Sequence, residues 1–270
     1  MRRELGGHLW TIAPELRDRV RPLHAPASEP WSVVVEDARV GAVRLGGRVR
    51  HEPDAQTLLL VVHGLGGSSE SPYVRRAAVA AGVLGWSCLR IDLRGADGRG
   101  EDVYHAGLWE DLVAGLAERS LARYSRVAVL GFSLGGHVTM RLALAGADPR
   151  VTAVAAVCAP LDLGASATAF DRRRVWLYRS HVLRALKATV RAVASRRGSD
   201  LGWDLPAIMG VRKIREWDAR VVVPRHGFAD VDDYYARASA APRLGELAIP
   251  ALYIGARHDP MVPAFAIEPA

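Results

Sequence analysis

The most constraining feature of this sequence is a short apolar run that breaks into a glycine-rich turn around a serine. Residues 127–130 have the composition of a buried β-strand, and Gly131-Phe132-Ser133-Leu134-Gly135 follows directly, ahead of a helical stretch. A Gly-x-Ser-x-Gly pattern between a strand and a helix is the signature of a nucleophile elbow. The serine of such a sharp turn has a strained backbone, which requires small residues on both sides, and Gly131 and Gly135 meet that requirement. The pattern therefore predicts that the hydroxyl of Ser133 projects above the end of a sheet.

The same turn predicts where a developing negative charge would be stabilised. Leu134 begins the helix, so its backbone N–H and the positive end of the helix face any oxyanion formed at Ser133. A second donor is expected from the loop after the apolar run 58–62, where the N–H of Leu65 is the best candidate. His63 at the start of that loop is interpreted as a structural brace rather than a catalytic group.

Apolar runs of strand length alternate with helical stretches along most of the chain. This alternation predicts a mostly parallel sheet with right-handed crossovers and helices on both faces. The expected strands are 58–62, 86–93, 127–130, 151–157 and 251–255, and helices are expected at about 73–81 and 108–121.

Two earlier runs predict an antiparallel hairpin at the edge of this sheet. They are Trp31–Val35 and Ala38–Leu45, joined by a tight turn. Gly46, Gly47 and Pro53 are expected to end the second strand.

The length and apolar content favour a single domain over residues 1–270. A chain of 270 residues that is 50% hydrophobic can form one large core. Residues 1–56 are interpreted as a lead-in with the edge hairpin, and residues 163–240, which have no strong strand signal, as an insertion. In a doubly wound fold this insertion would leave the carboxyl ends of the strands, so it is expected to form a helical cap over Ser133.

The positive charge of the chain is concentrated in that insertion. The whole sequence has 36 Lys and Arg against 29 Asp and Glu, whereas residues 163–240 have 15 against 8. Apolar residues at helical spacing predict a helix over Arg173–Arg197 with arginines on its other face. Such a face is either a solvated surface or a contact with anionic lipid, and both interpretations stay open. No nucleic-acid partner is expected.

The cysteines predict a chain without a metal framework, and no apolar run approaches the roughly 18 residues that a membrane span requires. Cys88 and Cys158 each lie in an apolar run typical of a buried strand, which predicts two unpaired core thiols. No Cys/His spacing typical of a metal site occurs, and no cofactor is expected. Because the first eight residues lack the apolar middle of a signal peptide, a cytoplasmic location is expected.

The acid that would complete a catalytic triad has one main candidate. Asp259 follows the last predicted strand in a loop at the active edge of the sheet, and Asp162, after the preceding strand, is the alternative. Enzymes with this elbow place the triad in the order serine, acid, histidine. No histidine follows among the 11 residues after Asp259, so the base is expected beyond Ala270. Weaker substitutes within the sequence are His105, His226 and His258.

Several longer blocks carry a family resemblance. The clearest are His63–Arg76, which begins His-Gly-Leu-Gly-Gly-Ser-Ser, and His226-Gly227-Phe228-Ala229-Asp230 followed by Asp233-Tyr234-Tyr235. Shorter blocks are Gly7-His8-Leu9-Trp10-Thr11, Leu93-Arg94-Gly95, Tyr104-His105-Ala106-Gly107 and Gly131–Gly136. With these blocks the sequence resembles the YheT-type branch of the α/β-hydrolases over nearly its whole length.

The resemblance implies a serine hydrolase of carboxylic esters, including acylglycerols and related lipids. It implies Ser133 as nucleophile, Asp259 as acid and small-molecule esters as substrates. Members of the branch continue past the acid with a helix, a strand and a Gly-Gly-His segment, so the last strand and helix are expected to be missing here. The alternative is a hydrolase-like binding protein without full catalytic machinery, or a C-terminally truncated fragment.

Overall fold

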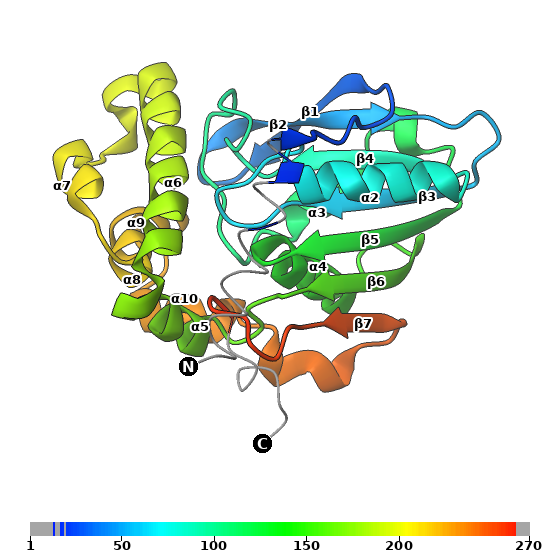
Figure 1. The fold of residues 1–270 in the computed structure, drawn as a ribbon. Coiled ribbons are helices and arrows are strands. Elements are labelled where there is room, and N and C mark those ends of the chain that lie inside the picture. The colour runs from blue at the N-terminus through cyan, green and yellow to red at the C-terminus, as the bar shows by residue number, and fades with distance from the viewer. Residues whose placement is uncertain (1–12, 14–16, 19, 263–270) are drawn as a thin grey trace.

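The computed structural model describes residues 13, 17–18 and 20–262. The predicted motif at residues 7–11 therefore lies outside the described residues. In the described part, seven strands form one sheet in the order β1-β2-β4-β3-β5-β6-β7 (Figure 1). The strands are β1 (Glu29–Asp37), β2 (Gly41–Arg50), β3 (Thr57–Val62), β4 (Ser87–Asp92), β5 (Arg126–Phe132), β6 (Val151–Val157) and β7 (Ala251–Ile254).

The sheet is parallel from β4 to β7 and antiparallel at the hairpin edge. β3 pairs in parallel with both β4 and β5, while β2 pairs antiparallel with β1 and β4. β4 is buried along its whole length and β3 over most of it, which accounts for their nearly continuous apolar sequences. The predicted α/β fold with a mostly parallel sheet is confirmed.

The prediction that two glycines end the second strand is wrong. β2 continues through Gly46 and Gly47, where it pairs with β4. A Cβ atom on Gly47 would lie 2.5 Å from the backbone oxygen of Arg90, so glycine at this position permits the two strands to approach. The strand also begins later than predicted, because residues 38–40 form the turn and Gly41, with a φ of 75°, is the first residue of the strand.

Helices cover both faces of the sheet. α2 (Pro72–Val83) packs on one face, where Val74 and Ala78 meet Val61 and Cys88. α3 (Glu110–Leu116) and α4 (Leu134–Ala145) lie on the opposite face (Figure 1). The helix predicted at 108–121 is shorter than expected, because α3 ends at Leu116 and a separate 3₁₀ turn follows, η1 (Arg119–Leu121).

Between β6 and β7 the chain is mostly helical, and residues 163–238 lie beyond the carboxyl ends of the strands (Figure 1). The longest helix, α6 (Trp176–Arg197), buries Leu186, Val190 and Val193, as the apolar spacing of this region predicted, and it buries Leu183 in addition. No helix within the described residues combines the length and apolar content needed to cross a bilayer. The elements are α5 (Leu163–Phe170), η2 (Arg173–Val175), α6 (Trp176–Arg197), η3 (Gly198–Leu201), α7 (Leu205–Gly210), α8 (Ile214–Trp217), η4 (Asp218–Val222), α9 (Val223–His226), α10 (Val231–Ala238) and η5 (Ala241–Glu246).

The basic side chains of α6 do not form one uniform solvated face. Arg179 donates to the carbonyls of Phe170 and Arg172, and Lys187 donates to two carbonyls at the end of α7. Arg197 donates to a carbonyl in the hairpin. These cations hold the helical segment together and fasten it to the sheet.

Candidate active site

Ser133 lies at the junction of β5 and α4 in a strained backbone conformation. Ser133 stands between the last strand residue, Phe132, and the first helical residue, Leu134, and has a φ of 51° and a ψ of −122°. Among the described non-glycine residues only Ser133 and Cys158 have a positive φ. A Cβ atom on Gly135 would lie 2.3 Å from the backbone oxygen of His63, so the turn requires glycine there. The predicted strand–turn–helix arrangement is present.

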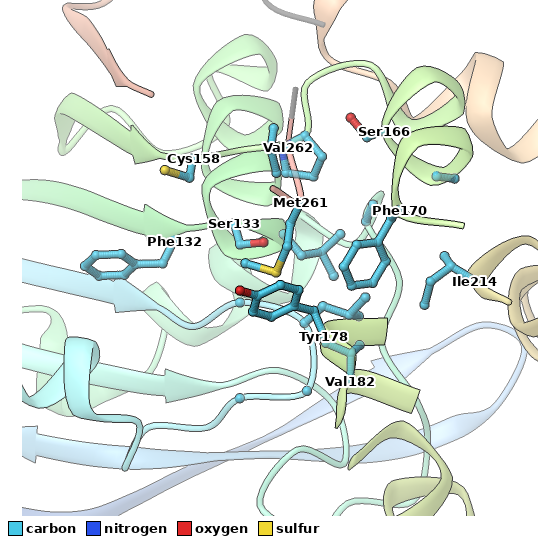
Figure 2. Close-up of a pocket in the computed structure, with 18 of the residues that line it drawn as sticks. Phe132, Ser133, Cys158, Ser166, Phe170, Tyr178, Val182, Ile214, Met261 and Val262 are labelled. Carbon is cyan, nitrogen blue, oxygen red and sulfur yellow. The ribbon is translucent and has the colours of Figure 1, made fainter. Parts of the chain in front are cut away.

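The turn lines a large, mainly apolar cavity. Its volume is about 1180 Å³, and its lining includes Ser133 and residues of the helices between β6 and β7. In Figure 2 the hydroxyl of Ser133 points into this pocket, which Phe170, Tyr178 and Val182 enter from the helical segment. A cavity of this size and character accepts an extended apolar chain.

The two predicted oxyanion donors both lie on the wall of this cavity. Leu65 and Leu134 line it together with Ser133. Within the described part of the chain neither N–H donates a hydrogen bond, whereas the next amide, that of Gly66, donates to the hydroxyl of Tyr104 at 2.8 Å. Two unpaired donors beside one hydroxyl can stabilise negative charge on a bound carbonyl oxygen.

His63 has the bracing role that the sequence predicted. The side chain is fully buried, and its Nε2 accepts a hydrogen bond from the N–H of Leu93 at 3.1 Å. The proton therefore lies on Nδ1, which donates to the carbonyl of Gly64 at 2.8 Å. Burial lowers the pKa of His63, so the ring is a neutral link between two loops.

Asp259 and Asp162 have different surroundings. Asp259 lines the cavity, and its Oδ1 accepts the N–H groups of Met261 and Val262 at 2.8 and 3.1 Å. Asp162 is not part of the cavity lining and instead caps α5, where its Oδ1 accepts the N–H of Ala165 at 2.9 Å. Of the two candidate acids, only Asp259 shares the pocket with Ser133.

The prediction that both cysteines are core thiols of strands holds for Cys88 and is wrong for Cys158. Cys88 is buried in β4. Cys158 follows the end of β6 with a φ of 49°, is half-buried and lines the same cavity as Asp259. Burial and then the negative charge of Asp259 raise the pKa of the Cys158 thiol to about 11, so it is a neutral neighbour of that carboxylate.

No described histidine is hydrogen bonded to Ser133 or to Asp259. His105 and His226 lie against each other with ring centroids 4.3 Å apart, and burial lowers both pKa values. His258 and His181 also line the cavity, and His181 was not singled out from the sequence. The described residues bring together Ser133, Asp259 and the two donors, but no base at hydrogen-bond distance.

Several polar residues of the cavity wall were not predicted from the sequence, and Asp218 is the most buried carboxyl group among them. Asp218 lines the pocket from the first turn of η4 and accepts a hydrogen bond from Tyr235. The only signal in the sequence is a carboxylate within the mostly charged stretch 212–220, which is typical of many surface helices.

A mostly parallel sheet of this order, with a serine on a strained strand–helix turn above an apolar cavity, defines the α/β-hydrolase class. The model of the family described as "alpha/beta hydrolase fold" matches residues 57–269. The chain belongs to this α/β-hydrolase family. Among the described residues no cluster of three His, Cys, Asp or Glu side chains could hold a metal ion.

Individual relatives confirm the predicted resemblance to the YheT-type branch. The chain is 35% identical over 222 residues to the Escherichia coli (strain K12) protein named "Putative esterase YheT", a match that covers 80% of this chain and 64% of the relative. It is 27% identical to a Mus musculus protein named "Phospholipase ABHD3", over 79% of this chain and 54% of the relative. The chain thus spans between about half and two thirds of the length of these curated relatives.

Solved structures agree on the fold. A hydrolase from Pseudomonas aeruginosa PA01 has a TM-score of 0.52 at 21% identity, covering 87% of this chain and 83% of that one. A structure described as a membrane phospholipase A has a TM-score of 0.53 at 16% identity, covering 99% of this chain and 87% of the other. At these identities the likeness concerns the fold alone.

Proposed function

We propose that this protein is a serine hydrolase of carboxylic esters that acts through an acyl-enzyme on Ser133. The observation that carries the proposal is the hydroxyl of Ser133 on a left-handed turn, facing an apolar cavity between two unpaired N–H groups. Strain at a single non-glycine residue persists where the surrounding structure enforces it, and it clusters at active sites. The names of the relatives, an esterase and a phospholipase, support the same reaction class.

In the proposed reaction the Ser133 oxygen attacks the carbonyl carbon of the ester while its proton passes to a base. The carbonyl oxygen becomes an oxyanion that accepts hydrogen bonds from Leu65 and Leu134. Collapse of this intermediate breaks the bond to the alcohol, which leaves with the proton, and water then releases the acid from Ser133. Asp259 would orient the histidine base that the family resemblance implies, and the described histidines that line the same cavity are His105, His181 and His258.

The cavity favours lipid-like esters, such as acylglycerols, over small polar ones. A volume of about 1180 Å³ lined by Phe170, Val182, Ile214 and Val222 buries a long chain. At about 25 cal/mol per Å² of apolar surface, a chain that fills this space gains several kcal/mol of binding free energy.

A lipid surface also explains the outer rim of this cavity. At the start of α6, Trp176 and Leu177 are 56% and 61% exposed, and Leu177 also lines the cavity. Arg172 and Arg173, just before them, are exposed as well. We therefore narrow the predicted contact with anionic lipid from the whole of Arg173–Arg197 to residues 172–177, since several cations farther along α6 are bonded to carbonyls.

Hydrolysis of p-nitrophenyl esters of increasing chain length tests the proposed reaction. We expect Ser133→Ala to abolish turnover, while Ser125→Ala, at an exposed serine outside the cavity, leaves it unchanged. Turnover that survives Ser133→Ala would exclude Ser133 as nucleophile. Binding of esters without any turnover in the unmodified protein would favour the hydrolase-like binding protein instead.

A further inference from the structure

The wall of the cavity contains a buried carboxyl group that no part of the proposed reaction uses. Asp218 is only 7% exposed and lines the cavity together with Tyr235, which reaches it from α10. The hydroxyl of Tyr235 donates to Oδ2 of Asp218 at 2.6 Å. This is the only hydrogen bond found for the Asp218 side chain among the described residues.

Asp218 is not balanced by a cation within the described part of the chain. Arg215, three residues before it in the chain, pairs with Asp232 at 2.7 Å and lies over the ring of Tyr235. Most neighbours of Asp218 in the wall are apolar, including Ile214 and Trp217. Burial raises the pKa of Asp218 to about 7, so near neutral pH the group exists both as an acid and as a carboxylate.

A second polar group of the cavity lining is also unsatisfied. Ser166 on α5 is buried, and its hydroxyl has no hydrogen-bond partner. Its helix packs against α8, which ends directly before Asp218, and against α10, which carries Tyr235. Figure 2 shows Ser166 and Ile214 among the residues of the cavity. A buried polar group without a partner is unfavourable, and a ligand hydroxyl in this region would supply the missing hydrogen bond.

The backbone at Asp218 is irregular in the same place. Residues 218–222 form η4, a π-helix, between two short α-helical segments. π-helical turns are rare and occur frequently at functional sites. Here the turn sets the carboxyl group of Asp218 in the cavity lining.

We infer that Asp218 and Ser166 form a polar subsite for a hydroxyl group carried on the chain of a lipid-like ester. This inference rests on the proposed function, because it assigns the cavity to the substrate. A neutral hydroxyl suits Asp218 in either state, since it donates to the carboxylate and accepts from the acid. An anionic group would be repelled by the carboxylate, and a fully apolar chain would leave both polar side chains unsatisfied.

Ligand binding to the Ser133→Ala variant tests the subsite without depending on catalysis. The probes are 1-alkanols and α,ω-alkanediols of equal length, with 8 to 12 carbons, measured by calorimetry. We expect the ratio of the alkanol Kd to the diol Kd to fall by about tenfold when Asp218→Leu is added, since one hydrogen bond to a charged or polar group is lost. The difference in water solubility between the two ligands cancels, because the same two ligands are compared in both proteins.

Two further variants keep the test decisive. Ile214 is an apolar neighbour of Asp218 in the wall, so Ile214→Val should weaken the binding of both ligands alike and leave the ratio of their Kd values unchanged. If Asp218→Leu does not fold, Ser166→Ala replaces it, with an expected fall of about threefold. An unchanged ratio in the folded subsite variant would overturn the inference. A diol preference that depends on Asp218, found together with a lack of esterase activity in the protein that retains Ser133, would keep the subsite and refute the proposed function.

Discussion

The turn at Ser133 and the wall at Asp218 belong to one cavity but are built in opposite ways. The turn is formed by backbone that is close in sequence or paired in the sheet, with Gly135 packed on the carbonyls of Val62 and His63. The wall combines side chains from α5, η4 and α10, which are separated by long stretches of chain. The reactive group thus follows from a five-residue pattern, whereas the groups that would select a ligand depend on tertiary packing.

The largest expected effect is the loss of stability caused by a substitution in the turn at Ser133 that leaves the wall at Asp218 unchanged. In Gly135→Ala the new methyl group would meet backbone atoms of residues 62 and 63 at 2.3 to 2.8 Å, which the sheet cannot relieve. We expect the free energy of unfolding to fall by more than about 4 kcal/mol, measured from urea midpoints. The matched control is Gly164→Ala in α5, where the nearest atom lies 3.6 Å away and the expected change is below about 1 kcal/mol. Similar losses for both variants would contradict the difference between the two regions.

The second prediction removes one oxyanion donor without removing the hydroxyl. Leu65→Pro deletes the N–H that faces the cavity, so turnover should fall by roughly 10²–10³ with little change in KM. Leu65→Ala keeps the N–H and should retain most of the turnover. A Leu65→Pro protein with an unchanged circular dichroism spectrum and full turnover would remove this amide from the site.

The sequence predicted the sheet, the elbow and the cavity-facing Asp259 because local patterns determine them. It could not predict that Cys158 leaves the strand for the cavity, because its left-handed φ depends on the turn after β6. Nor does the spacing of arginines distinguish Arg179, bonded to carbonyls, from the exposed Arg173. Partners contributed by distant helices, such as Tyr235 for Asp218, leave no local pattern.

The third prediction concerns the pH dependence of stability at the wall. Because burial raises the folded pKa of Asp218 to about 7, above its ordinary value of 3.8, the contribution of this group to stability is fully present below about pH 4 and is lost as pH rises through 7. Relative to Asp218→Asn, the unmodified protein should therefore lose up to a few kcal/mol between pH 4 and 7. Urea midpoints of both proteins across this range measure the difference. A difference that stays constant with pH would show that Asp218 is ionised normally in the folded state.

The fourth and smallest effect concerns the rim of the cavity. Replacing Trp176 and Leu177 by serine should weaken binding to anionic vesicles by about tenfold. Binding of the unmodified protein should also weaken as salt is added, since each exposed arginine contributes about 1 kcal/mol at low ionic strength. The matched control replaces Val83 and Leu84, which are exposed at the end of α2, and should bind as before. Equal binding to neutral and anionic vesicles, or equal losses in both variants, would contradict the assignment of this surface.

The most direct test of the account is the site of covalent labelling by a fluorophosphonate with an alkyl chain. Mass spectrometry of the labelled protein should locate the phosphonyl group on Ser133 alone, and Ser133→Ala should carry no label. Among the described residues no histidine is hydrogen bonded to the Ser133 hydroxyl, so labelling should be slow. A long-chain alcohol that fills the cavity should slow the labelling further. Label on another residue, or undiminished label in Ser133→Ala, would contradict the claim that the strained turn carries the nucleophile.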